Sequence, residues 1–266
     1  MRGPRWLACV ALLTATACTG GTTPPRPLVL AWSDEFDGPA GARPNAATWR
    51  ADVGTDWGNQ QLEFDTDLAS NASLDGQGHL VITARREPYQ GRSFTSARLT
   101  TEGKHRVQYG RIEVRAQLPR GRGLWPAFWL LGDNLRTVGW PASGEIDVME
   151  YRGQEPNRVH GTVHGPGYAG GGGITRDTTL RHVRFDNSFH VFAIEWTADQ
   201  IVWFVDGQRY HVVARGDVPG PWVFDRPFHL LLNVAVGGTF VGSPDQYTPF
   251  PTAMVVDWVR VYRLTP

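Results

Sequence analysis

The stretch Gly144-Glu145-Ile146-Asp147-Val148-Met149-Glu150-Tyr151 places three carboxylates within six residues, with only apolar residues between them. Side chains alternate along an ideal strand, so Glu145 and Asp147 share one face while Ile146 and Val148 point into a core. Glu150 would point to the core face unless one extra residue, a β-bulge around Val148-Met149, returns it to the other two acids. A helix fits less well, because its turn of about 100° per residue separates Glu145 from Asp147 and Glu150. We therefore expect a bulged strand that carries a ladder of three acids.

Like charges this close cannot all be ionised at neutral pH, so at least one acid should keep its proton and have a raised pKa. Four effective strand steps put the backbones of Glu145 and Glu150 about 13 Å apart. Side chains that lean inward could bring the carboxyls to about 5–5.5 Å, the separation of retaining glycosidases. In this interpretation Glu145 attacks the anomeric carbon, Glu150 acts as acid and then base, and Asp147 controls ionisation. Taken alone, the pattern equally allows a hard-cation site or a solvated strand face.

Composition favours one large all-β domain with a neutral partner. The chain has 266 residues, and its acidic and basic side chains balance at 26 each. Such a balance provides no field that would attract nucleic acid or an acidic polymer. The 11 tryptophans and 31 glycines indicate short strands, many turns and aromatic platforms. Flat indole faces suit sugar rings, although core packing must account for most of them.

The chain from Leu28 onward reads as short β-type runs separated by Gly, Pro, Asn and Asp. The clearest hairpin has the turn Asp206-Gly207, the pair favoured in type I′ turns. No segment shows a sustained helical period, so we expect a two-sheet β-sandwich of the jelly-roll kind. A glycine patch at 170–173 predicts a mobile loop bordering a cleft. The expected strands are His79–Arg85, Tyr109–Leu118, Leu124–Leu131, Glu145–Tyr151, Arg158–His164, His190–Trp196, Ile201–Val205, Gln208–Val213, His229–Val236 and Val255–Arg263.

Residues 1–27 are expected to be outside the folded domain. Residues 1–17 have two arginines, an apolar run too short to span a bilayer and the end Ala15-Thr16-Ala17, which together predict a secretory signal. Cleavage there would leave Cys18 first, as in a bacterial lipoprotein, although Ala15 stands where such sites usually carry Leu. Ordinary cleavage with a spectator cysteine is the alternative. Residues 18–27 predict a Thr/Gly/Pro-rich tether, and residues 28–266 the catalytic domain.

A series of motifs follows the chain over about residues 31–263, essentially the whole domain. They are Trp32–Phe36, Gly58–Glu63, Tyr109–Arg115, Trp125–Gly132, the acid ladder, His160–His164, Phe189–Trp196, Asn233–Gly238 and Asp257–Tyr262. Taken in order, these motifs resemble glycoside hydrolase family 16, and within it the bacterial endo-β-1,3-glucanases called laminarinases. The ladder has the longer, bulged spacing of laminarinases, which lichenases and κ-carrageenases lack.

The resemblance implies a concanavalin A-like jelly roll with an open concave groove and a retaining double displacement. It places the nucleophile at Glu145, the acid/base at Glu150 and the assisting carboxylate at Asp147. It also implies substrate contacts, although Trp129 could be core, His164 could satisfy a backbone group and Arg98 could be a plain surface residue. These contacts are Asn59, Arg98, Trp125, Trp129, Trp140 and His164. Phe64-Asp65 departs from the aromatic pair common in the family, which leaves the distal donor subsites undefined.

The resemblance implies no cofactor for catalysis, but many relatives hold a structural calcium, and Glu35 and Asp257 match positions that help bind it. The leading interpretation is a secreted, lipid-anchored, monomeric endo-β-1,3-glucanase acting on β-glucan. One alternative is a family member that acts on lichenan or agarose or transfers glycosyl groups. Another is a β-glucan-binding protein without catalysis, but such a protein should have lost a glutamate of the ladder.

Overall fold

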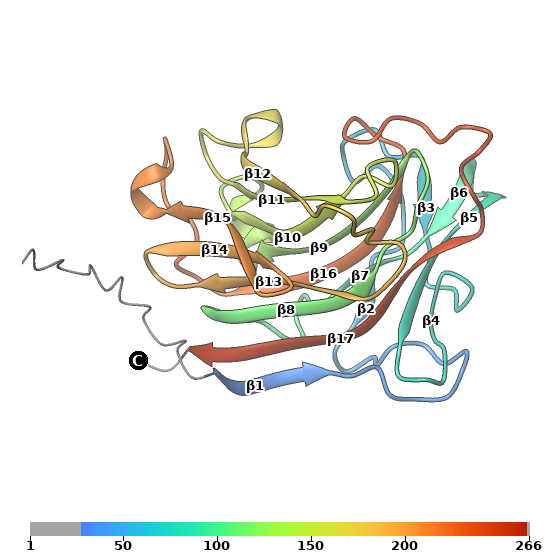
Figure 1. Ribbon diagram of the computed structural model, residues 1–266, viewed down its shortest axis with the longest axis horizontal. Helices are drawn as coiled ribbons and strands as arrows, with labels where there is room; N and C mark the ends of the chain where they lie inside the picture. Colours follow the sequence, from blue (N-terminus) through green and yellow to red (C-terminus); the bar gives the residue numbers. More distant parts are fainter. Residues whose placement is uncertain (1–27, 265–266) are drawn as a thin grey trace, which may run out of the picture.

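The computed structural model describes residues 28–264. The predicted signal peptide (1–17), the tether (18–27) and the lipidation site at Cys18 lie outside the described residues. Within residues 28–264, no helix is long and apolar enough to cross a membrane. The described chain is almost entirely β-structure, and its strands form two sheets that lie face to face (Figure 1). The predicted all-β, jelly-roll sandwich is confirmed.

The larger sheet has ten strands, paired in the order β15-β14-β13-β8-β17-β5-β6-β3, with β1 on β17 and β4 on β5. All its pairs are antiparallel except β3 with β6. Their bounds are β1 Leu28–Asp34, β3 Glu63–Asp65, β4 Ala72–Leu74, β5 Leu80–Tyr89, β6 Arg92–Ser96, β8 Gly110–Gln117, β13 His190–Trp196, β14 Gln200–Val205, β15 Gln208–Ala214 and β17 Thr252–Leu264.

The smaller sheet has seven antiparallel strands in the order β12-β11-β10-β9-β16-β7-β2, and it carries the acid ladder on β10. Their bounds are β2 Arg50–Ala51, β7 Arg98–Thr100, β9 Leu124–Gly132, β10 Glu145–Tyr151, β11 Arg158–His164, β12 Ile174–Thr179 and β16 Phe228–Val236. A single helical turn, α1 Leu135–Val138, and two 3₁₀ turns at 170–172 and 215–217 lie in the connections.

The core lies between the two sheets, because each strand turns alternate side chains toward the opposite layer. On β9, Phe128 and Leu130 are fully buried in this core. Trp129 between them is only partly buried and lies on the outer face of the seven-stranded sheet. On β9, therefore, Phe128 and Leu130 point into the core and Trp129 points to the outer face.

The ten strands expected from the sequence are all present, with ends that differ by a few residues. The hairpin is also confirmed: Val205 pairs with Gln208, and the turn residues Asp206 and Gly207 have φ of 48° and 77°. The sequence pattern did not reveal β1, β2, β3, β4, β6, β7 and β12. Most of these are two or three residues long or, like β12, too exposed to show alternation.

Candidate active site

The three acids of β10 reach one face of the sheet through the predicted β-bulge. On β11, Thr162 pairs with Asp147 and His160 with Glu150, so three steps along β10 match two steps along β11. The register against β9 shifts at the same place. Val148 and Met149 are both buried in the core, at 1% and 0% exposure. The bulge thus supplies the extra residue that keeps Glu150 on the side of Glu145 and Asp147.

Each glutamate of the ladder accepts a hydrogen bond from a tryptophan. Trp140 Nε1 donates to Glu145 Oε2 at 2.8 Å, and Trp125 Nε1 donates to Glu150 Oε1 at 3.0 Å. Thr162 Oγ1 lies 3.4 Å from the other oxygen of Glu150. Such donors stabilise an ionised carboxylate and fix the direction in which it points.

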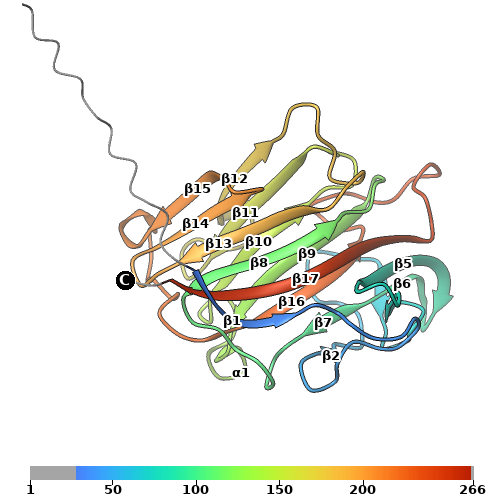
Figure 2. The ribbon, with the colours of Figure 1, turned by 60° about the horizontal axis from the view of Figure 1, so that its bottom comes forward.

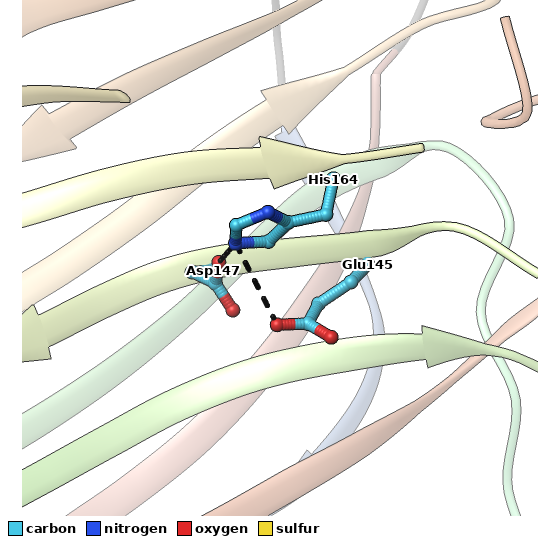
Figure 3. A group of neighbouring side chains, drawn as sticks. All are labelled: Glu145, Asp147 and His164. Carbon is cyan, nitrogen blue, oxygen red and sulfur yellow. Dashed lines mark ion pairs between the residues drawn. The ribbon is translucent and has the colours of Figure 1, made fainter. Parts of the chain in front are cut away.

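His164 of β11 lies over the other end of the ladder (Figure 3). Its Nε2 is 3.2 Å from Asp147 Oδ2 and 3.8 Å from Glu145 Oε1. Gly173 packs against this imidazole, since a Cβ there would lie 2.4 Å from His164 Cε1. The last residue of the glycine patch therefore lies beside His164, and the expectation that the patch is mobile and borders a cleft stays a prediction.

Burial raises the pKa of all three acids. The pKa of Glu145 rises to about 8, that of Glu150 to about 7, and that of Asp147 well above its usual range. Repulsion within the ladder acts in the same direction, whereas a cationic His164 lowers the pKa of both glutamates. The contact between the Glu145 and Asp147 carboxyls further raises the pKa of Glu145 and partly offsets the rise in the pKa of Asp147. The ladder therefore holds protons at neutral pH, and its titration steps belong to the three acids together.

Arg98 of β7 is held between two tryptophan rings. Its Cζ lies 4.8 Å from the ring centre of Trp57 and 4.8 Å from that of Trp129. Its Nε is 3.3 Å from Asp52 Oδ2, so the guanidinium has a charge partner as well as two aromatic faces. Arg98 is therefore not a plain surface residue, and it covers one face of the Trp129 ring.

The remaining predicted contacts surround the ladder in different ways. Trp140 is 47% exposed, whereas Trp125 is only 8% exposed and packs its ring against Phe240. Trp125 is thus mostly buried, and it contributes a hydrogen bond to Glu150 more than an exposed ring face for stacking.

Asn59 is exposed in a left-handed turn with φ of 54°, and its carbonyl oxygen accepts a hydrogen bond from the Thr239 amide. Gly238 brings this turn beside Trp125, since a Cβ there would lie 2.8 Å from Asn59 O and 3.5 Å from Trp125.

The carboxylates predicted for calcium are each paired with an arginine. Arg260 donates twice to Glu35, at 3.0 and 2.8 Å, and Arg115 pairs with Asp257. Arg260 engages both oxygens of Glu35 and Arg115 engages one oxygen of Asp257, so the donor set does not fit calcium as predicted.

Within residues 28–264, the only group of three potential metal ligands is Glu145, Asp147 and His164, with donor atoms within 4.8 Å of one another. This group belongs to the ladder, and its imidazole nitrogen is not a ligand that calcium prefers.

Several residues at the site were not singled out from the sequence. Trp57 precedes the Gly58-Asn59 motif directly, so its position was a usable signal. Asn233 accepts the indole N–H of Trp129 at 2.8 Å and begins a motif already noted. Thr162 lies within the motif His160–His164 already noted, whereas Asp52 had no local signal, because only sheet pairing brings it to Arg98.

Jelly-roll sandwiches with protonatable glutamates on the outer face of one sheet form a class of glycoside hydrolases, and both features are present here. Residues 50–260 match the sequence profile described as Glycosyl hydrolases family 16. The chain belongs to this family. The predicted resemblance is confirmed.

Relatives of known name agree with this assignment. A β-glucanase of Rhodothermus marinus is 46% identical over 245 residues, which cover 88% of this chain and 85% of that protein. A glucan endo-1,3-beta-glucosidase of Cryptopygus antarcticus is 37% identical over 87% of each chain. The solved endo-beta-1,3-glucanase of Pyrococcus furiosus is 48% identical, with a TM-score of 0.86 over 90% of this chain and 96% of that one.

Proposed function

We propose that this protein is an endo-acting hydrolase of β-1,3-glucan that works by a retaining double displacement. The observation that carries the proposal is the bulged ladder, which places two glutamates with raised pKa values on one face, each held by an indole N–H. The names of the relatives support the glucan linkage.

Each acid has a role that follows from its surroundings. Glu145 attacks the anomeric carbon after its proton has passed to the neighbouring carboxylate of Asp147, because attack requires the ionised carboxylate. Glu150 keeps its proton near neutral pH and gives it to the leaving oxygen, and it then removes a proton from the water that cleaves the glycosyl-enzyme. Hydrolysis by this route requires no catalytic cofactor.

The outer face of the seven-stranded sheet suits an uncharged polysaccharide. Trp140 and the Trp57–Arg98–Trp129 stack offer apolar faces, and Asn59, Arg98 and His164 offer donors for hydroxyls. The balance of 26 acidic and 26 basic side chains gives no general attraction for sulfated or uronic polymers. An open groove along this face would bind the middle of a chain.

The proposal is tested by incubating the purified protein with laminarin, lichenan, agarose and carrageenan and identifying the products. We expect laminarin to be cleaved fastest and to give a spread of oligosaccharides at the first time points. Glucose as the sole early product would show an exo-acting enzyme, and faster cleavage of agarose or carrageenan would overturn the substrate assignment. Binding of laminarin without any cleavage would favour the non-catalytic alternative.

We also propose that the protein is secreted and anchored to a bacterial membrane through a lipid on Cys18, and that the domain is a monomer. The support for secretion and for the lipid anchor is the order of charged, apolar and small residues before Cys18. Cys18→Ser should move the full-length protein from the membrane fraction to the soluble fraction of a bacterial host. Unchanged membrane attachment would refute the anchor.

A structural calcium remains a proposal that the family resemblance supports and the arginine pairs of Glu35 and Asp257 oppose. If calcium binds, a chelator should lower the melting temperature of the purified protein and added calcium should restore it. No change with chelator would remove calcium from the proposal.

A further inference from the structure

The bulge in β10 is tied to the opposite sheet by one hydrogen bond through the core. Trp203 of β14 donates its Nε1–H to the backbone oxygen of Asp147 at 2.8 Å. Trp203 is 0% exposed and Asp147 is 3% exposed. A bulge interrupts the regular ladder of backbone hydrogen bonds, and leaving a buried carbonyl without a partner is destabilising. Trp203 thus satisfies a backbone oxygen of the catalytic ladder from the other layer of the sandwich.

The indole of Trp203 is itself held in place on both sides. His211 of β15 stacks on it, with ring centres 4.7 Å apart and an angle of 28° between the planes. Burial lowers the pKa of His211 to about 4, so this imidazole is neutral when it packs on the indole. The pairing of β14 with β15 also shifts between Trp203 and Phe204, so a second irregularity lies across the core from the bulge.

Gly161 of β11 leaves the space through which the indole reaches the ladder. A Cβ at this position would lie 2.4 Å from Trp203 Cδ1, 2.7 Å from Trp203 Nε1 and 2.6 Å from the Tyr210 hydroxyl. Such contacts are shorter than packed atoms tolerate, so any larger residue would push the indole and this hydroxyl away. Gly161 also precedes Thr162, the cross-strand partner of Asp147. The lack of a side chain at Gly161 therefore leaves the space that the Trp203 indole needs to donate its hydrogen bond to Asp147.

We propose that Trp203 is a positioning residue for the acid ladder. Its N–H fixes the main chain of Asp147 where the strand departs from regular pairing, and so sets the direction in which Asp147 and Glu150 face the substrate. A loss of this bond lets the bulge relax, and a misplacement of about 1 Å at reacting groups can cost about 100-fold in rate. The inference rests on the proposed glycosidase function but does not depend on which polysaccharide is cleaved.

The test compares Trp203→Phe with Trp196→Phe. Trp196 is a matched control, because it is also 0% exposed, lies on the neighbouring strand β13 and donates its Nε1–H to a backbone oxygen, that of Phe224 at 3.0 Å. Each variant removes one buried indole N–H, so both should lower the melting temperature by a similar amount. Only Trp203→Phe should lower kcat, by about tenfold or more, with KM changed by less than about twofold.

Gly161→Ala gives a second variant that keeps the indole but displaces it. We expect the same loss of kcat, and we expect the double variant with Trp203→Phe to lose less than the product of the two single losses, because both act on one contact. All assays use the polysaccharide that the wild-type protein cleaves best, at a temperature where unfolding curves show every variant folded. Equal kcat values for Trp203→Phe and Trp196→Phe would overturn the proposal, as would an unchanged kcat for Gly161→Ala. A wild-type protein that cleaves no polysaccharide would instead refute the proposed function.

Discussion

Glu145 and Glu150 are proposed to serve different steps, and the products formed in the presence of added azide distinguish the two roles. Glu145→Ala should abolish turnover, because no carboxylate remains to form the glycosyl-enzyme. Glu150→Ala should still react with substrates that have very good leaving groups, since these need no proton. Azide should then give the β-azide with the Glu150 variant and the α-azide with the Glu145 variant. The opposite anomers would exchange the two roles, and full activity in either variant would remove the assignment.

The raised pKa of Glu150 predicts a stability that falls as pH rises. Between its usual 4.5 and the folded value of about 7, the folded protein binds more protons at this carboxyl than the unfolded chain does. Stability is therefore lost as pH increases through that window. Glu150→Gln removes this loss. The melting temperature of the variant minus that of wild type should therefore increase between about pH 5 and about pH 8, by an amount equivalent to roughly 1–3 kcal/mol in the free energy of unfolding. Thermal unfolding at several pH values measures it, and a constant difference would contradict the shift.

At the scale of single residues, the sequence predicted the acids because their spacing along one strand is local. It could not predict what lies against them from other strands. The indole of Trp129 looked like a free platform, yet Arg98 covers one of its faces and Asn233 accepts its N–H. For Trp203 the sequence indicated only a position in a strand, because its hydrogen-bond partner is a backbone oxygen of a strand distant in the sequence.

Among the elements, the connection between β9 and β10 carries an exposed aromatic directly to the ladder. Trp140 is 47% exposed and donates to Glu145. Trp140→Ala should change the melting temperature little, because few core contacts are lost. It should lower kcat/KM by about 5- to 150-fold, the equivalent of roughly 1–3 kcal/mol for a buried ring and its contacts. Kinetics on laminarin and a thermal melt measure both quantities.

Two controls separate the causes of this loss. Trp140→Phe keeps a ring but removes the N–H, so an effect as large as that of Trp140→Ala would assign the loss to the bond with Glu145. Tyr247→Ala truncates an aromatic that is 82% exposed and lies outside the ladder and its hydrogen-bond partners, and it should leave kcat/KM unchanged. A large loss of stability in Trp140→Ala would contradict the surface role.

At the scale of elements, alternation predicted the long half-buried strands and the bulge, but it did not reveal the short strands. β6 and β7 bury the polar residues Thr95, Ser96 and Thr100, so their sequences lack an apolar period. The hydroxyl of Thr95 donates to Glu87, and that of Thr100 accepts from the Glu102 amide. β3 buries Glu63 and Asp65 on one face of the strand, and Asp65 accepts the indole N–H of Trp57 at 2.9 Å. These elements depend on tertiary hydrogen bonds that no local pattern expresses.

Taken as a whole molecule, the described residues begin with β1, which pairs with the last strand. Leu28 pairs with Leu264 and Asp34 with Val259, so β1 closes one side of β17. A shortened protein that begins at Leu28 should be soluble and keep its melting temperature and its kcat on laminarin. Removal of a further seven residues, a length equal to that of β1, should lower stability, because the edge of β17 would lose its partner. Equal melting temperatures for these two proteins would show that β1 contributes nothing.

The pairing of β1 with β17 also makes the molecule suitable for circular permutation. The first and last described strands run side by side in the ten-stranded sheet (Figure 2), and cross-strand partners such as Leu28 and Leu264 have Cα atoms about 5 Å apart. A short linker could therefore join the two ends without distorting either sheet. New ends could then be opened at the exposed Asp206-Gly207 turn, far along the chain from every acid of β10. The order of the strands along the chain could thus be changed while the arrangement that brings the acids together is kept.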